Sequence, residues 1–258
     1  MSGRELTLLA EGRVELLGRI PRSSNETFLV QVSCGDDSAH AVYKPEAGER
    51  PLSDFEPGLY RRERAAYLLS ESLGWGLVPL TVIREKAPLG IGSLQWFIDC
   101  DFEEHYFTLY AGAPETHREL AQIALFDYVT NNTDRKSGHV LRAHNGRVWG
   151  IDHGLCFSAG FKLRTVIWDF AGEPIPDALL EDLAPLAEAV PPEMAELLDG
   201  SEVTALQRRV RRLLLEPVLP VDHTGMRYPW PLVEGGSAVG NDETNAKVAY
   251  CLRGLSGR

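Results

Sequence analysis

The chain has 258 residues, of which 44% are hydrophobic and 24% are charged, a composition typical of a globular protein with a sizeable core. Its 26 Lys and Arg residues stand against 37 Asp and Glu, which gives a formal net charge of −11. This charge disfavours nucleic acid as the main partner and opposes broad attraction to anionic membranes, so we expect membrane contact to be peripheral at most. No window approaches the roughly 20 apolar residues of a membrane span, and the run LTLLA near the start is too short for a signal peptide.

The first hundred residues are predicted to be rich in β structure, beginning with a β-rich stretch over residues 6–45. Short runs of β-branched and aromatic residues alternate with turn-forming segments such as PRSSNE. One helix is predicted over residues 58–73, because Ala65, Ala66 and Leu69 share one face and Gly74 follows as a stop. The predicted strands span residues 14–20, 27–32, 40–45, 77–83 and 93–99.

The remainder of the chain is predicted to be mostly helical. The acidic stretch DCDFEEHYF is interpreted as the crossing between two lobes. A helix is expected over residues 115–131, where Asp127 interrupts an otherwise apolar stripe and therefore needs polar partners. A short strand follows at 147–152, then helices punctuated by Pro over 176–215 and an irregular tail rich in Gly and Pro. The predicted fold class is α+β, with a β-rich N-lobe over residues 1–100 and a mostly helical C-lobe over residues 101–258.

The stretch YVTNNTDRKSGHVL, residues 128–141, gathers acidic, basic and amide side chains between apolar anchors. A second acidic motif, GIDHGLCF, follows the next predicted strand. Two carboxylates and a lysine at one cleft meet the needs of phosphoryl transfer, in which one acid orients the attacking hydroxyl, another holds Mg²⁺ and lysine binds phosphate. The residues of this pattern, in chain order, are Lys44, Glu63, Asp134, Lys136, His139 and Asp152.

These motifs resemble those of the protein-kinase-like superfamily, in particular the phosphatidylinositol 3-/4-kinases and the HipA-type bacterial kinases. The segment AVYKPEAGERPLSDF is similar to the phosphate-lysine strand of type II phosphatidylinositol 4-kinases, NNTDRKSGH to their catalytic loop, and GIDHGLCF to their metal-binding segment. The whole chain resembles an actinobacterial family related to those lipid kinases. The resemblance implies a two-lobed fold that binds ATP between the lobes together with Mg²⁺ or Mn²⁺.

The resemblance also implies a role for each residue of the pattern. Lys44 would contact the α- and β-phosphates of ATP, and Glu63 would position that lysine through a salt bridge. Asp134 would act as the catalytic residue that orients the acceptor hydroxyl, and Lys136 would neutralise charge on the transferring phosphate. Asp152 would be the principal metal ligand.

Two further segments are expected to contact the nucleotide. The turn with Ser23, Ser24 and Asn25 would cover the triphosphate; it has no GxGxxG, but backbone N–H groups in such a turn can still bind phosphate. Phe97 and Ile98 fall where the hinge between the lobes would bind adenine through main-chain groups.

His139 stands where most of these kinases have Asn, and its imidazole offers nitrogen instead of an amide oxygen. A nitrogen ligand suits Mn²⁺ or Zn²⁺ better than the oxygen-preferring Mg²⁺. Two interpretations are open: His139 binds the metal, in an enzyme that uses Mn²⁺ or a single Mg²⁺, or it hydrogen-bonds Asp134 or Asp152. A rival reading is a structural zinc site, although it leaves Lys44 and the two carboxylates unexplained. Its ligands would be His139, His144, His153 and Cys156.

From these residues we expect an ATP-dependent phosphotransferase that transfers the γ-phosphate to a hydroxyl of a lipid, a protein or a small molecule. The alternatives are a nucleotide-binding pseudokinase that regulates without chemistry, and an enzyme that transfers AMP on the same fold. The widely spaced cysteines form no CxxC pair, which favours reduced thiols and a cytoplasmic location.

Overall fold

A five-stranded antiparallel sheet forms the first part of the structure, a computed structural model that describes residues 3–21, 23 and 25–229. Its strands lie in the order β1-β2-β3-β5-β4, so the neighbours β3 and β5 come from distant parts of the chain. Lys44 lies near the end of β3, opposite Ser93 of β5. The elements are β1 (Arg13–Arg19), β2 (Phe28–Cys34), β3 (Asp37–Pro45), β4 (Thr81–Arg84) and β5 (Gly92–Trp96).

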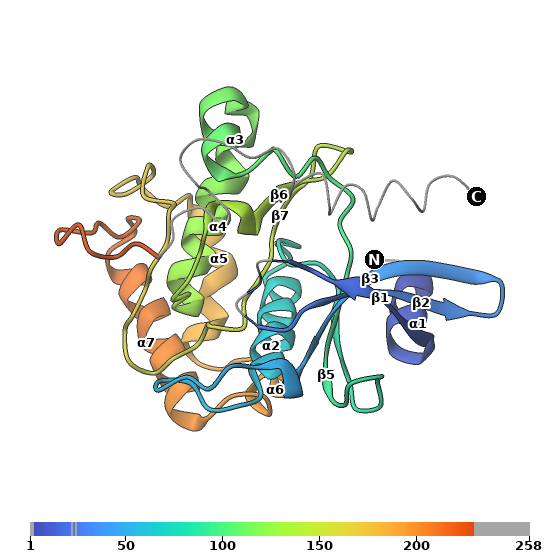
Figure 1. Ribbon diagram of the computed structural model, residues 1–258. Helices are drawn as coiled ribbons and strands as arrows, with labels where there is room; N and C mark the ends of the chain where they lie inside the picture. The colour runs from blue at the N-terminus through green and yellow to red at the C-terminus, as the bar shows by residue number, and fades with distance from the viewer. Residues whose placement is uncertain (1–2, 22, 24, 230–258) are drawn as a thin grey trace.

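Helix α2 (Leu59–Ser72) connects β3 to β4 and lies between the sheet and the helical part of the molecule (Figure 1). Its fully buried residues Ala65, Ala66 and Leu69 recur at helical spacing, as the sequence predicts. The main-chain N–H of Gly58, just before the helix, donates to Glu49 Oε2 at 2.8 Å. Gly74 follows the helix with φ of 69°, a left-handed conformation that glycine adopts without a Cβ clash.

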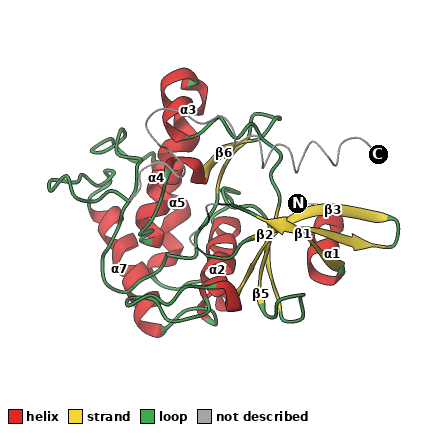
Figure 2. Cartoon of the chain, viewed as in Figure 1, coloured by secondary structure: helices red, strands yellow, loops and turns green. Residues whose placement is uncertain are grey.

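The second part of the chain is mainly helical, and the cartoon separates its helices clearly from the sheet (Figure 2). Between α4 and α5 lies a small antiparallel hairpin of β6 and β7. Short 3₁₀ turns at Glu46–Gly48, Pro114–Thr116, Ser137–His139 and Ala184–Ala187 join several elements. The remaining elements are α3 (Tyr106–Gly112), α4 (His117–Thr130), β6 (Val140–Arg142), β7 (Val148–Gly150), α5 (Asp177–Leu183), α6 (Pro192–Ala195) and α7 (Gly200–Leu215).

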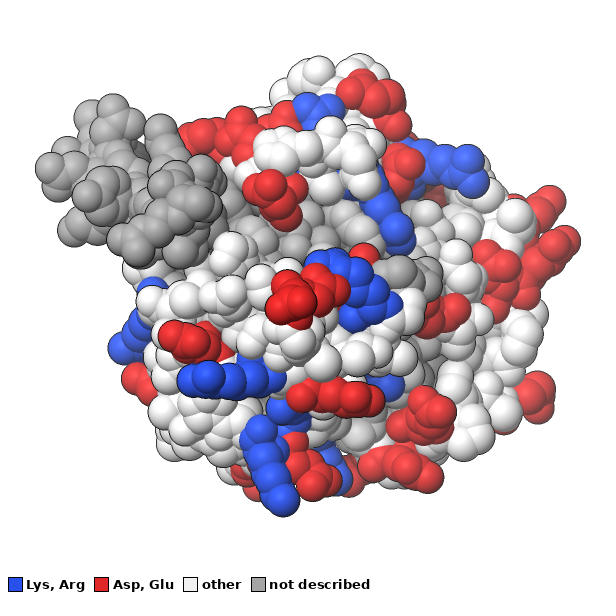
Figure 3. Space-filling model, turned by 90° about the vertical axis from the view of Figure 1, so that its right-hand side faces the viewer, with Lys and Arg blue, Asp and Glu red and all other residues white. Residues whose placement is uncertain are grey.

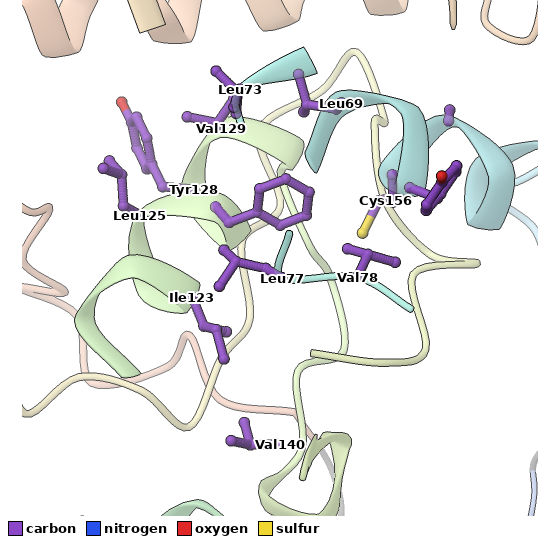
Figure 4. Packing of buried hydrophobic residues seen from close by; sticks show 14 of the residues in the cluster. Leu69, Leu73, Leu77, Val78, Ile123, Leu125, Tyr128, Val129, Val140 and Cys156 are labelled. Carbon is purple, nitrogen blue, oxygen red and sulfur yellow. The ribbon is translucent and has the colours of Figure 1, made fainter. Parts of the chain in front are cut away.

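One hydrophobic cluster extends through both parts and fixes α2 relative to the helices. It includes Leu69 of α2, Leu73 just after that helix, and Ile123 and Val129 of α4, all nearly or fully buried (Figure 4). A second, small cluster gathers Ile98, Cys100 and Leu141 where the chain leaves the sheet. The α+β class expected from the sequence is confirmed, with a β-rich first part and a mostly helical second part.

The surface drawn in Figure 3 carries interspersed acidic and basic side chains. Among the helices of the described residues, none has both the length and the apolar character needed to span a bilayer.

Part of the predicted secondary structure was wrong. The start of the expected β-rich stretch is instead helix α1 (Gly3–Glu11), which buries Leu8 and Leu9 against the sheet. The strand expected at 77–83 begins only at Thr81, because the segment before it contains Pro79 and approaches the second lobe, where Gly150 N donates to Leu77 O at 2.8 Å. The acidic stretch ends in α3, which the sequence analysis did not predict.

Candidate active site

Lys44 is the centre of an ion-pair cluster between the sheet, α2 and the segment that follows β7. Its Nζ lies 2.5 Å from Glu63 Oε1 and 2.8 Å from Asp152 Oδ1. Glu63 is nearly fully buried and accepts two more hydrogen bonds, from the main-chain N–H groups of His153 at 3.0 Å and Gly154 at 3.1 Å. Glu63 therefore fixes both the lysine and the chain beside Asp152. The expected Lys44–Glu63 pairing is present.

The ionisation of this cluster is set by competition between burial and charge. Burial lowers the pKa of Lys44, but attraction to Asp152 and Glu63 outweighs it, and the net pKa is raised. Burial alone raises the pKa of the Asp152 carboxyl, yet the charge of Lys44 holds it well below its ordinary value. Both groups are therefore charged near neutral pH. Asp152 also has φ of 61°, an uncommon conformation for a residue with a side chain, and such backbone strain is concentrated at functional sites.

Asp134 lies in the loop after α4, where Asn131 takes a left-handed φ of 53° and turns the chain out of the helix. Its Oδ2 accepts a hydrogen bond from Lys136 Nζ at 2.6 Å, and its main-chain N–H donates to Asn132 Oδ1 at 3.0 Å. Burial raises the pKa of Asp134, and the hydrogen bond from Lys136 opposes this only in part. The structure thus brings Asp134 and Lys136 together as a directly bonded pair.

A buried arginine joins this loop to the Asp152 segment. Arg135 is fully buried, with Nη2 2.9 Å from Oδ1 of the equally buried Asp127. Its guanidinium also donates to Ile151 O at 2.5 Å and to His153 Nε2 at 2.8 Å. Asp127 thus has the polar partner that its place in an apolar stripe requires, and the two loops that carry the carboxylates are fixed to one another.

His139 lies beside Asp152, with Nε2 3.3 Å from Asp152 Oδ2. Its other ring nitrogen, Nδ1, accepts a long 3.4 Å contact from the main-chain N–H of Lys136, which orients the ring. Two adjacent ligand atoms that each lie about 2.1 Å from one octahedral cation are ~3 Å apart. The 3.3 Å between His139 Nε2 and Asp152 Oδ2 is close to this value, so the two side chains could occupy adjacent positions around a divalent ion. Within the described residues no three His, Cys, Asp or Glu side chains converge on one point, so a cation here would rely on phosphate oxygens or water for its other ligands.

A cavity connects these groups, and Lys44, Glu63, Asp134 and Asp152 all line it. Ser23 and Asn25 line it as well, as expected for a loop over the phosphates, whereas Ser24 lies outside the described residues. Several other lining residues were missed by the sequence analysis, since nothing in their local pattern marked them. They are Glu26, Thr27, Pro45, Glu49, Leu59, Tyr60, Gly154 and Leu155.

The two hinge residues lie apart from this cavity. Phe97 and Ile98 are not among its lining residues, and the main-chain N–H of Phe97 donates to His40 O at 3.3 Å. Ile98 packs with Cys100 and Leu141 in the small cluster between the lobes. The structure therefore leaves their adenine role as a prediction.

The rival zinc site finds no support in the positions of its ligands. The imidazole of His144 is 68% exposed and pairs with Asp99 at 3.7 Å, whereas the side chains of His153 and Cys156 are fully buried. His153 Nε2 is already bonded to Arg135.

The arrangement of sheet, α2 and helical part is shared with solved kinases, which defines the class of the fold. A Golgi casein kinase, whose crystal structure has Mn and ADP bound, superposes with a TM-score of 0.52 over 89% of this chain and 80% of that one, at 13% identity. A structure of hydra Fam20 with sugar gives 0.51 over 86% of this chain and 94% of its own, also at 13% identity. The fold is kinase-like.

Sequence comparison gives the family. The profile described as phosphatidylinositol 3- and 4-kinase matches residues 60–214. Protein Rv2133c of Mycobacterium tuberculosis is 42% identical over 264 residues, which cover 88% of this chain and 95% of that protein. The chain belongs to the phosphatidylinositol 3- and 4-kinase family, together with this actinobacterial relative.

Proposed function

We propose that the protein is an ATP-dependent phosphotransferase that transfers the γ-phosphate of ATP to a hydroxyl acceptor. The observation that carries the proposal is the cavity in which Lys44, Asp134 and Asp152 meet. In it, Lys44 would exchange its contact with Asp152 for the α- and β-phosphates while Glu63 keeps its ammonium in place. Ser23, Ser24 and Asn25 would cover the triphosphate, and Phe97 and Ile98 would bind the adenine.

The catalytic loop is suited to the acceptor side of the reaction. Asp134 would accept a hydrogen bond from the acceptor hydroxyl and orient its oxygen toward the γ-phosphorus as the bond to the leaving ADP breaks. Lys136, bonded to Asp134 at 2.6 Å, would neutralise charge on the transferring group. Because its pKa is raised by burial, Asp134 is also a better proton acceptor than an exposed aspartate.

A divalent cation would neutralise the developing charge on the phosphates. We propose that Asp152 and His139 hold it, which favours Mn²⁺ over Mg²⁺ because one ligand is nitrogen. The Mn and ADP of the Golgi casein kinase structure support nucleotide and metal use on this fold.

We also propose that residues 1–100 form the N-lobe and residues 101–258 the C-lobe. We further propose a cytoplasmic location, which the free thiols of Cys34, Cys100 and Cys156 support.

Turnover of ATP labelled on either its α- or its γ-phosphate tests the proposal. We expect metal-dependent release or transfer of the γ-label, abolished in Asp134→Ala and in Asp152→Ala. The exposed Asp101 does not line the cavity, so Asp101→Ala is a control that should leave activity unchanged. Full turnover in both site variants would overturn the mechanism.

The same assay distinguishes two alternatives, a regulatory pseudokinase, which His139 in the catalytic loop favours, and transfer of AMP on the same fold. Binding of ATP and metal without any turnover would show a regulatory pseudokinase. Transfer of the α-label to a protein or small molecule would show AMP transfer instead, and product mass would distinguish AMP from phosphate. The proposed hydroxyl acceptor is a lipid, a protein or a small molecule.

A further inference from the structure

Arg62 makes three contacts that reach well beyond its own helix. It precedes Glu63 in α2, and its side chain is only 13% exposed. Its Nη1 lies 2.7 Å from Glu202 Oε1 of α7 and donates to Cys156 O at 3.0 Å. Its guanidinium also lies over the ring of Phe55, 5.0 Å from the centroid. One side chain therefore joins α2 to α7, to the segment after Asp152 and to the loop before α2.

The adjacent residue, Glu63, binds the same segment. Glu63 accepts the main-chain N–H groups of His153 and Gly154, while Arg62 donates to the carbonyl of Cys156. Two consecutive residues of α2 thus bind three of the four residues that follow Asp152. Any movement of α2 away from the helical part would break these bonds together with a largely desolvated ion pair.

The partner Glu202 is itself held rigidly. Its Oε2 accepts the main-chain N–H of Asp199 at 3.0 Å, the reciprocal bond of the capping box at the start of α7. Further along α7, the buried Arg209 donates through Nε to Val129 O at 2.9 Å, near the end of α4 and the start of the catalytic loop. A continuous set of packed contacts therefore runs from α4 through α7 and Arg62 to Glu63 and Lys44.

We propose that Arg62 is a positioning residue of the nucleotide site: its ion pair with Glu202 keeps α2 against the helical part, and thereby keeps Glu63 on Lys44. The inference rests on the proposed binding of ATP at Lys44. It differs from a general role in folding because it acts through one residue, Glu63. Contacts within this chain hold Glu63 on the lysine in this structure.

A double-mutant cycle measures this dependence directly. The variants are Arg62→Met, Glu63→Gln and the two combined, and the readout is the dissociation constant for ATP with Mn²⁺ by calorimetry. We expect Arg62→Met to weaken binding by about tenfold, within the range of coupling energies between contacting residues. In the Glu63→Gln background the same change should have little further effect. Arg61→Met, on the same helix but exposed, is the matched control and should bind ATP as the unmodified protein does.

A milder variant covers the case in which Arg62→Met does not fold. Glu202→Gln removes the charge from the ion pair, yet Gln can still close the capping box of α7. We expect folded protein with weaker ATP binding, again without further effect when Glu63→Gln is present. Unchanged affinity in Glu202→Gln, or equal losses with and without Glu63→Gln, would overturn the role of Arg62. If the unmodified protein bound no ATP, the proposed function and this inference would both fall.

Discussion

The buried pair of Arg135 and Asp127 allows a sharp prediction for the variant Asp127→Ala. Both side chains are fully buried, and the carboxylate accepts bonds from Arg135 Nε at 2.9 Å, from Arg135 Nη2 at 2.9 Å and from Asn132 Nδ2 at 2.9 Å. Alanine removes all of these acceptors and leaves the guanidinium without a counter-charge. The two residues connect α4 to the loops that carry Asp134 and Asp152, so losing this ion pair also removes a contact that positions both carboxylates.

The expected magnitude follows from this burial. Removing one partner of a buried ion pair costs about 3–5 kcal/mol, since the remaining charge stays desolvated. Arg135 keeps its bonds to Ile151 O and His139 O, which compensate it in part, so we place the loss near the lower end, at about 3 kcal/mol. A typical domain is stable by roughly 5–15 kcal/mol. The variant should therefore still fold, but its unfolding midpoint should lie at a clearly lower urea concentration.

Urea denaturation followed by fluorescence measures the free energy of unfolding in each variant. Glu181→Ala, an exposed carboxylate on α5, is the matched control and should change this free energy by less than about 0.5 kcal/mol. If Asp127→Ala lost less than about 1 kcal/mol with an unchanged urea slope, the pair would not be the desolvated charge pair described above.

Further predictions concern the metal, the thiols and a site glycine. With ATP and Mn²⁺ bound, pulsed electron paramagnetic resonance should detect coupling of the metal to an imidazole nitrogen that disappears in His139→Gln; a spectrum with no such coupling would exclude His139 as a ligand. In the native protein at pH 8, alkylation mapped by mass spectrometry should reach the exposed Cys34 before Cys100 and Cys156, because burial raises the pKa of Cys100 to about 12 and also raises that of Cys156. Equal rates for these three thiols would contradict this burial. Gly154→Ala should lower the unfolding temperature only slightly, because an added Cβ would lie 3.4 Å from Glu63 Oε1, an ordinary van der Waals distance. A large decrease in the unfolding temperature would show that a Cβ cannot be accommodated in this turn.

The sequence predicted those parts of the fold in which local pattern and tertiary packing agree. Helix α2 was placed within one residue at each end, because its apolar spacing and the glycine after it both mark the same segment. Helix α1 was missed, since its nine residues carry only a short apolar run and gain their burial from the sheet. The predicted end of strand β5 lay too far along the chain, at residue 99 instead of Trp96. The apolar Ile98 packs in the small cluster between the two parts of the chain and not in the sheet.

The candidate site was predictable where charged residues recur in a recognisable order. Lys44, Asp134 and Asp152 were found in this way, and all three line one cavity. Glu49 and Tyr60 were not found, because Glu49 lies in the loop before α2 and Tyr60 in the first turn of the helix, and their approach to the cavity depends on tertiary contacts. The Arg62–Glu202 pair was equally hidden, since 140 positions separate two charges that each resemble ordinary helix-surface residues.

The central claim is that Lys44 binds the phosphates of ATP in the cavity it shares with the two aspartates. The most direct measurement is the calorimetric dissociation constant for ATP with Mn²⁺ in Lys44→Met, compared with Lys86→Met, which removes an exposed lysine elsewhere in the same lobe. A charged contact to phosphate worth about 1.4 kcal/mol or more predicts at least a tenfold weaker affinity for Lys44→Met and no change for Lys86→Met. Equal affinities in the two variants would contradict the account.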